Sequence, residues 1–377
     1  MALHQETITL PPAAPGVARQ LSVLRYVSAE PGPKAYIQAA LHGDEIPALL
    51  VAQHLRERLT ALDAAGKLRG EIILLPYANP IGLSQFLQGW HLGRYELDSG
   101  ANFNRDYPDL FEPVAAAVAG KLFGDAAANV ALIRAAIRTA LAGLPRAQSE
   151  NTALKRALHG MACDADVVLD LHCDYEATMH LYIGTPLWPA AADLAACMQS
   201  PVNLLSEDSG GAAFDEACSR IWWRLARHFP NHPIPPACCA ATVELRGERD
   251  VSDAFAAEDA SGIIQFLALR GFVNGPPPLL PASLPTATDL DAVDSMNAPL
   301  PGVLIWSTEL GSEVKAGDVL GHLLDPATGI RHPIVARTEG LLFARRGHRF
   351  ARPDQWIAKI AGRQPLAWRK PGALLSS

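Results

Sequence analysis

The stretch Leu41-His42-Gly43-Asp44-Glu45-Ile46-Pro47 places an imidazole and a carboxylate three residues apart, directly after an apolar segment. That segment, residues 35–40, has the composition of a buried strand, and residues 46–59 have the apolar spacing of a helix. His42 and Glu45 are therefore expected in the turn between a strand and a helix. Because open α/β sheets bind ligands at such strand ends, we interpret the pair as half of a zinc site.

The spacing of His42 and Glu45 is weak support by itself, because His54 and Glu57 repeat it. The second pair lies inside the predicted helix among arginines, and we interpret it as part of a solvated face. Support for a metal must come from the position of the first pair and from a third ligand.

The rest of the first 274 residues alternates between predicted strands and helices. A hairpin or edge-strand region occupies the first thirty residues. Further strands are expected at 71–76, 165–171, 179–185 and 237–245, and helices at 113–123, 128–143, 150–162, 188–199, 214–229 and 254–271. Such alternation is typical of an α/β fold with a mainly parallel or mixed sheet flanked by helices.

A proline-rich segment is expected to divide the chain, which is longer than a usual single domain. Residues 275–285 contain five prolines, so we predict a catalytic domain at 1–274, a linker at 275–287 and a second domain at 288–377. The last part has short β-branched segments separated by glycines, which predicts an all-β unit. Its segment 311–323 is similar to half of a lipoyl- or biotinyl-type barrel, but no lysine occupies a tight hairpin there, so no carrier role is expected.

The overall composition favours a cytoplasmic protein that acts on a small molecule. A formal charge of −7 and the absence of a Lys/Arg cluster argue against nucleic acid as the main partner. The six cysteines show no C-x-x-C spacing, which fits a reducing compartment. The N-terminus does not have the pattern of a signal peptide, and no apolar run approaches the roughly 18 residues of a membrane span, so no membrane partner is expected. A homo-oligomer is compatible with the sequence.

His172 is the predicted third ligand, because it stands at the end of the apolar strand 165–171. A catalytic zinc ion commonly takes two histidines and one glutamate and keeps one position for water. His42, Glu45 and His172 supply that set for one zinc ion per chain. Taken alone, His172 could equally be a hydrogen-bonded core histidine.

Two carboxylates near predicted strand ends complete the interpretation. Asp170 precedes His172 by two residues and so lies on the same strand face, where it could hold the outer nitrogen of a ligating imidazole. Its alternative is a helix cap or a partner for an arginine. Glu244 ends an apolar strand and is the candidate general base; its alternative is an ion pair with Arg246 or Arg249.

The segment 90–109 lacks periodicity and is rich in polar residues, which is common for functional loops. Arg105, beside Asn104, has the planar guanidinium that binds a carboxylate, and Arg94 could polarise a scissile carbonyl. Either arginine alone could form a surface ion pair.

Four motifs in this order, HGDE (42–45), NFNR (102–105), DLH (170–172) and VEL (243–245), resemble those of the succinylglutamate desuccinylase/aspartoacylase family. These are zinc-carboxypeptidase-like enzymes, and the resemblance spans about residues 35–250. It implies a zinc-carboxypeptidase-like fold followed by a C-terminal β domain of the barrel-sandwich hybrid kind.

The resemblance also implies roles for individual residues. His42, Glu45 and His172 would bind zinc. Asn104 and Arg105 would bind the substrate's carboxylate, and Glu244 would be the general acid/base. Arg94 with Tyr95 is similar to the family's Arg-Tyr pair, with a longer gap to Asn104, and would polarise the carbonyl. One departure is that the family's late substrate-site tyrosine is missing, because no tyrosine follows Tyr182.

We therefore expect a zinc-dependent amidohydrolase that removes the acyl group from an N-acyl amino acid or a related small carboxylate. The desuccinylase, aspartoacylase and deacetylase types all remain open. The alternatives are a peptide carboxypeptidase with the same centre, and a metal- or ligand-binding module without catalysis.

Overall fold

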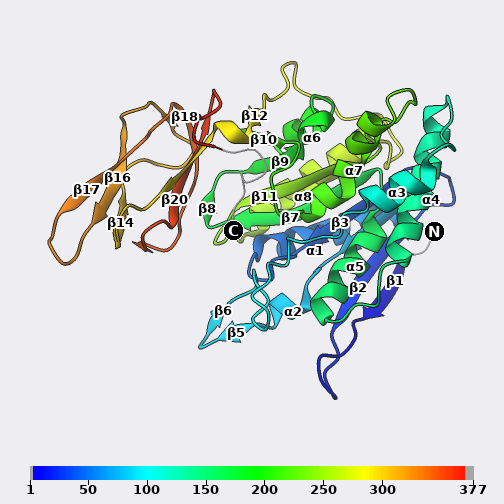
Figure 1. The fold of residues 1–377 in the computed structure, drawn as a ribbon, viewed down its shortest axis with the longest axis horizontal. Helices are drawn as coiled ribbons and strands as arrows, with labels where there is room; N and C mark the ends of the chain where they lie inside the picture. The colour runs from blue at the N-terminus through cyan, green and yellow to red at the C-terminus, as the bar shows by residue number, and fades with distance from the viewer. Residues whose placement is uncertain (1–2, 370–377) are drawn as a thin grey trace.

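A nine-stranded mixed sheet forms the centre of the larger part of the chain (Figure 1). The computed structural model describes residues 3–369. In spatial order the strands are β1 (Leu3–Thr9), β2 (Gln20–Val27), β4 (Glu71–Leu75), β3 (Lys34–Ala39), β7 (Val167–Asp174), β11 (Cys239–Gly247), β9 (His180–Gly184), β10 (Val202–Ser206) and β12 (Thr288–Asp289). The central run β4-β3-β7-β11 is parallel. The pairs β1–β2, β2–β4 and β11–β9 are antiparallel, and β9–β10 and β10–β12 are parallel again. The predicted mixed sheet is confirmed.

Helices cover both faces of this sheet. One face carries α1 (Pro47–Ala64), α6 (Ala192–Cys197) and α8 (Asp253–Leu269), and the other carries α3 (Phe111–Val118), α4 (Ala126–Ala142), α5 (Glu150–Ala162) and α7 (Phe214–His228). The short helix α2 (Pro80–Leu83) follows β4. Because both faces are covered, the central strands are apolar almost throughout, as the sequence indicated.

Local capping sets several helix starts. Asp125, Ser149 and Ser252 each accept a hydrogen bond from a backbone N–H in the first turn of α4, α5 and α8. Two predicted helices are shorter than expected. The one predicted at 113–123 ends at Val118, and the one predicted at 188–199 is reduced to α6 after a 3₁₀ turn at Thr185–Leu187.

Two four-stranded antiparallel sheets build the C-terminal part. One contains β13 (Val293–Asn297), β20 (Trp356–Gly362), β18 (Gly340–Arg345) and β15 (Glu313–Val314); the other contains β17 (Arg331–Val335), β16 (Val319–Leu324), β14 (Gly302–Trp306) and β19 (Phe350–Ala351). Side chains from both sheets, such as Leu304, Leu323 and Leu342, share one apolar core. The predicted all-β unit is confirmed.

The C-terminal part lies beside the β9–β10 end of the large sheet (Figure 1). Residues 275–287 form no helix or strand, and β12, directly after them, pairs with β10. In return, β8 (Glu176–Ala177), which follows β7, pairs with β18. The domain limits given above stay a prediction. A strand of each part pairs with a sheet of the other part.

Residues 90–109 are not entirely irregular. Trp90–His91 forms β6, which pairs with β5 (Phe86–Leu87) in a hairpin that the sequence analysis missed. Beyond Trp90–His91, residues 92–109 form a loop with one isolated bridge between Tyr95 and Asn102. Within residues 3–369, no helix is long and apolar enough to cross a membrane.

Candidate metal and substrate site

Three neighbouring parallel strands bring the predicted site residues together. His42 follows β3, His172 lies in β7, and Glu244 lies in β11 directly opposite His172. Glu45 stands just before Pro47, which begins α1. The sequence analysis placed His172 after its strand; β7 in fact runs on to Asp174, so His172 lies within the β7–β11 ladder, one residue beyond the end of the ladder with β3. Side chains far apart in the chain therefore meet at the carboxyl end of the sheet.

A close backbone contact shapes the turn that carries His42 and Glu45. Gly43 N–H donates to the carbonyl of Gly93 at 2.9 Å. A Cβ at Gly93 would lie 2.1 Å from the backbone nitrogen of Asp44, so only glycine fits there. Ala40, two residues before His42, has a φ of +54°, a conformation that L residues rarely adopt and that often occurs at functional sites.

His42, Glu45 and His172 form one buried cluster. His42 Nδ1 lies 2.7 Å from Glu45 Oε1, and His172 Nδ1 lies 2.7 Å from Glu45 Oε2. Ligand atoms of the three residues all lie within 4.8 Å of one another, and the side chains are 2%, 6% and 2% exposed. This arrangement has the donor set and the proximity that a divalent metal ion requires.

The outer nitrogen of each imidazole faces an acceptor oxygen. His42 Nε2 lies 2.9 Å from Asn102 Oδ1, and His172 Nε2 lies 2.9 Å from Asp170 Oδ2. Asp170 Oδ1 in turn accepts a hydrogen bond from Gln38 at 2.9 Å. Acceptors at Nε2 favour the tautomer with its lone pair on Nδ1, which is the nitrogen that faces Glu45. Both histidines are thus oriented as ligands, and the residues fit a bound metal ion.

The charges of the cluster support the same interpretation. Burial opposes ionisation of Glu45, but His42 and His172 outweigh it and hold the pKa of Glu45 well below its usual value. Burial likewise opposes protonation of His172, but the carboxylates of Asp170 and Glu45 raise its pKa well above the usual value. The carboxylates in and around the cluster are therefore arranged to favour a positive charge between them.

Asp170→Asn tests the orienting role of this carboxylate. The amide keeps the shape but loses the charge that holds His172 Nε2, so we expect zinc affinity to fall roughly 10- to 100-fold. Competition with a chromophoric zinc chelator measures the change. Asp166→Asn, just before β7 and paired with Arg134 at 2.8 Å, is the control and should keep wild-type affinity. Unchanged affinity in Asp170→Asn would contradict the assignment.

Glu244 is half-buried and faces the same cavity. Its Oε2 atom is buried and has no hydrogen-bond partner among residues 3–369. Burial, and then the negative charge of Glu45, raise the pKa of Glu244 to about 8. Such a carboxylate is costly to keep for structure alone, and a pKa near neutrality suits a group that accepts and returns a proton.

The sequence offered an ion pair with Arg246 or Arg249 as the alternative role of Glu244, and the described residues form neither pair. Arg246 pairs with Asp259 instead, at 2.8 Å, and its φ of +66° turns the chain just after Glu244. Arg249 forms no ion pair with Glu244 either, among the residues that the structure describes. Glu244 is thus free of the neighbouring cations that the sequence offered.

Arg94 lies against the cluster. Its Nη1 atom is 3.0 Å from Glu45 Oε1 and 3.3 Å from His42 Nδ1, so Arg94 does form an ion pair, but with a buried carboxylate of the cluster. Arg94 reaches the position next to the ligands that a role in carbonyl polarisation requires.

Asn104 and Arg105 lie in the loop beside His172. Asn104 Oδ1 accepts from the backbone N–H of Phe214 at 2.8 Å, which leaves its amide nitrogen 3.4 Å from His172 Nε2. Arg105 donates to the carbonyl of Asn104 at 2.6 Å and forms no ion pair among residues 3–369. Lys155 holds the loop by donating to two of its carbonyls. A cation held in place without a carboxylate partner is available to a substrate's carboxylate.

Acidic residues also border the Arg105 end of the cavity. Asp215 and Glu216 lie in the first turn of α7, and both are buried. Burial, and then the charge of Glu216, raise the pKa of Asp215 to about 7. The Arg105 end of the cavity is therefore lined by side chains of both basic and acidic type.

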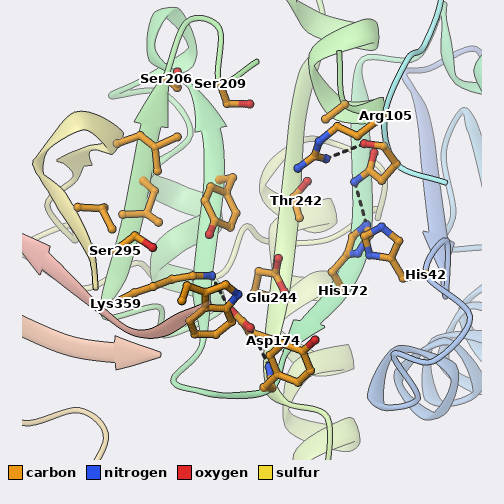
Figure 2. Close-up of a pocket in the computed structure, with 18 of the residues that line it drawn as sticks. His42, Arg105, His172, Asp174, Ser206, Ser209, Thr242, Glu244, Ser295 and Lys359 are labelled. Atoms are coloured by element: carbon orange, nitrogen blue, oxygen red, sulfur yellow. Dashed lines mark hydrogen bonds and ion pairs between the residues drawn. The ribbon is translucent and has the colours of Figure 1, made fainter. Parts of the chain in front are cut away.

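One cavity of about 630 Å³ connects these residues with the C-terminal part. Figure 2 shows His42, His172 and Arg105 on one side of Glu244, and Lys359 with Ser295 on the other. Lys359, from β20, bonds to Asp174 at 2.6 Å. The sequence analysis missed both. The sequence contains a feature that could have identified each of them. Lys359 is the one charged residue in the apolar segment 356–361, and Asp174 follows His172 by two residues on the same strand.

The fold and the cluster define a mixed α/β protein with a buried His-Glu-His site suited to a metal ion and with an all-β C-terminal part. Residues 31–127 match the model of the succinylglutamate desuccinylase/aspartoacylase catalytic domain. A candidate succinylglutamate desuccinylase/aspartoacylase family protein from Shewanella amazonensis SB2B is similar at 26% identity, with a TM-score of 0.86 and coverage of 95% of this chain and 98% of the other.

Other solved structures share this fold. A candidate succinylglutamate desuccinylase/aspartoacylase from Shewanella frigidimarina NCIMB 400 is 25% identical, with a TM-score of 0.84 over 96% of this chain and 97% of the other. The ectoine utilization protein EutE (DoeB) from Ruegeria pomeroyi is 16% identical, with a TM-score of 0.67 over 96% and 95%. A comparison with curated proteins gave no match. The resemblance to the succinylglutamate desuccinylase/aspartoacylase family, predicted from four motifs, is confirmed.

Proposed function

We propose that this protein is a zinc-dependent hydrolase that cleaves the amide bond of an N-acyl amino acid or a related small carboxylate. One observation carries the proposal: Glu244, whose buried Oε2 has no hydrogen-bond partner among residues 3–369, lines the same cavity as His42 and His172 of the ligand set. A module that only binds a metal or a ligand does not need such a base. When bound, zinc supplies a Lewis acid that polarises a carbonyl oxygen and makes hydroxide available near neutral pH.

The side chains of the cavity bind the substrate, transfer the proton and stabilise the developing charge. Arg105, with the amide of Asn104, binds the carboxylate of the amino acid and so places the amide bond over Glu244. Glu244 accepts a proton as water attacks the carbonyl carbon, and Arg94 stabilises the negative charge that develops on the carbonyl oxygen. When the C–N bond breaks, Glu244 returns its proton to the leaving amine. The products are a carboxylic acid and a free amino acid.

A peptide carboxypeptidase would use the same groups, but the contribution of the C-terminal part to the cavity lining supports a small substrate. Residues of the C-terminal part, including Ser295, Trp356 and Lys359, line the cavity beyond Glu244. A peptide would have to continue through this region. A hydrolysis screen of the zinc-loaded protein over N-acetyl, N-succinyl and N-formyl amino acids and dipeptides tests the proposal. Turnover of dipeptides but of no N-acyl amino acid would overturn it.

We expect Arg105→Gln to lower kcat/KM for an N-acyl amino acid about 100-fold, because one charge-assisted hydrogen-bonding group is lost. The effect should lie mainly in KM if Arg105 binds the substrate's carboxylate throughout the reaction. The control is Arg220→Gln, because Arg220 pairs with Asp208 at 2.5 Å and does not line the cavity, so kcat/KM should change little. Steady-state kinetics measure kcat and KM of both variants. An equal loss of kcat/KM in the two variants would contradict carboxylate binding by Arg105.

We also propose a cytoplasmic location. All six cysteines are free and buried, which supports a reducing compartment.

A further inference from the structure

Two acidic side chains border the Arg105 end of the cavity without a cation partner. Asp215 and Glu216, in the first turn of α7, are each 7% exposed, and both line the cavity. Neither forms an ion pair among residues 3–369. Glu216 Oε1 accepts a hydrogen bond from the backbone N–H of Ser209 at 2.7 Å, but its buried Oε2 has no partner among the same residues. Buried carboxylates are costly unless they are paired, so this pair suits a cation that a ligand brings.

Stabilisation of the start of α7 does not account for the burial of these acids. An acidic side chain in a first helical turn stabilises the helix at the surface as well, as the exposed Glu112 in α3 and Asp253 in α8 do. Burial, and then Glu216, raise the pKa of Asp215 to about 7, so a proton can remove one of the two charges. That proton still leaves Oε2 of Glu216 without a partner.

Arg105 is an unpaired cation in the same part of the cavity. Its Nη1 donates to the carbonyl of Asn104 at 2.6 Å, and the side chain extends into the cavity towards Thr242 (Figure 2). The loop and the helix are tied together, because Asn104 Oδ1 accepts from the backbone N–H of Phe214, the residue before Asp215, at 2.8 Å. The backbone thus holds opposite charges in one part of one cavity without pairing them. Such a site is complementary to a ligand that carries both a carboxylate and an ammonium group.

A second metal ion does not fit the two acids. Within residues 3–369, His42, Glu45 and His172 are the one group of three or more potential metal ligands close enough to hold an ion. An ammonium group needs fewer acceptors than a divalent metal ion, because it donates three hydrogen bonds and is not enclosed by six or more oxygen atoms. The cation that suits Asp215 and Glu216 is therefore an ammonium group.

In an N-acyl amino acid the α-nitrogen is part of the amide and carries no charge, so an ammonium group has to come from the side chain. We propose that Asp215 and Glu216 bind this side-chain ammonium group while Arg105 binds the α-carboxylate, so that the preferred substrates are Nα-acyl diamino acids such as those of ornithine and lysine. The inference rests on the proposed function. The same acids repel glutamate and aspartate, whose side chains are anionic.

The test compares Nα-acyl ornithine and lysine with Nα-acyl norleucine, whose side chain is similar in length but has no amine, and with Nα-acyl glutamate. Each is supplied to the zinc-loaded protein in acetyl and succinyl forms, so that the comparison does not depend on the acyl group. We expect kcat/KM for at least one of the diamino acids to exceed that for norleucine about tenfold or more, because a charge-assisted hydrogen bond is gained. Glutamate should give the lowest value.

Glu216→Gln should lower this preference for the diamino acid over norleucine at least about tenfold. Asp215→Asn should lower it in the same direction, and the wild-type comparison needs neither variant to fold. Glu207→Gln is the control, because Glu207 pairs with Arg227 at 2.6 Å and does not line the cavity. It should keep the wild-type preference.

Calorimetry with δ-aminovalerate and ε-aminocaproate, which are ornithine and lysine without the α-amine, gives a readout that does not depend on turnover. At least one of them should bind to the zinc-loaded protein about tenfold more tightly than valerate or caproate, and Glu216→Gln should remove this preference. No preference for a diamino acid in kcat/KM, or none for the amino form in binding, overturns the inference, while hydrolysis of other N-acyl amino acids leaves the proposed function standing. Failure to hydrolyse any N-acyl amino acid overturns the proposed function, and the binding data then decide the inference by themselves.

Discussion

Replacing Glu244 by glutamine should lower kcat about 10³-fold while zinc stays bound at one ion per chain. Glutamine has nearly the same shape but cannot accept the proton of the attacking water or return it to the leaving amine. The metal ligands are untouched, so the loss should appear in kcat rather than in zinc content. Steady-state kinetics together with metal analysis separate the two quantities.

The control for this variant is Glu258→Gln, because Glu258 is an exposed residue of α8 that accepts a hydrogen bond from Gln199 at 3.0 Å. It should keep wild-type kcat. Full turnover in zinc-loaded Glu244→Gln would sink the proposed mechanism, whatever the substrate.

Glu244 should also leave a pH signature in the stability of the metal-free protein. Its pKa rises from 4.5 to about 8 on folding, so between these values the folded state holds a proton that the unfolded state has released. This group therefore stabilises the folded state below pH 4.5, and its contribution is lost as the pH rises to about 8. Glutamine does not titrate, so the free energy of unfolding of Glu244→Gln should equal that of the wild type at pH 4 and be higher than that of the wild type at pH 8.

At pH 8 the free energies of unfolding of Glu244→Gln and the wild type should differ by about 2 kcal/mol. A pKa shift corresponds to about 1.4 kcal/mol per unit, and we take roughly half of that value because the carboxylate is partly open to the cavity. Thermal or urea unfolding of chelator-treated protein at several pH values measures it. A stability difference that does not depend on pH would contradict the raised pKa.

Replacing His172 by alanine should remove zinc binding and, with it, hydrolysis. This side chain provides one of three ligands, so the loss of zinc affinity should exceed the roughly 10- to 100-fold expected when only an outer partner such as Asp170 is changed. Metal analysis after dialysis and zinc titration measure the affinity. Treating the wild type with a chelator should abolish hydrolysis, and added zinc should restore it.

The matched control for His172→Ala comes from the chain's second His-x-x-Glu pair. His54 bonds to Asp253 and Glu57 to Gln53, at 3.0 and 2.9 Å on the outside of the protein. His54→Ala should therefore keep one zinc ion per chain and wild-type activity. If His172→Ala bound zinc as tightly as the wild type, the assignment of the metal site would be wrong.

Much of the local structure could be predicted because its signals are local. The apolar run 165–171 predicted β7, and the helical spacing after Ile46 predicted α1, because strand and helix periods are properties of short segments. The β5–β6 hairpin escaped prediction because its apolar side chains, including Phe86 and Trp90, lie on the surface and follow no buried pattern. The end of α3 was misplaced because its alanine-rich sequence predicts a longer helix, whereas the backbone leaves the helix at Ala119 and turns at Gly120, which has a φ of +70°.

The sequence by itself determined which side chains could bind a metal and where in the chain they stand. His42, Glu45, His172 and Glu244 each lie next to an apolar strand, and that follows from composition and spacing alone. Their residue types favoured the prediction of a metal-assisted reaction with a carboxylate base, since this donor set is typical of such sites.

Only the tertiary structure decided how these groups work together. Strand order brings His172 to Glu45 across 127 residues, and packing of the β unit brings Lys359 to Asp174 across 185. The same packing pairs Arg345 and Arg349 of the β unit with Glu176. No local pattern encodes such contacts, because sheet order and the docking of the two parts depend on the total burial of apolar surface and on shape complementarity along the whole chain.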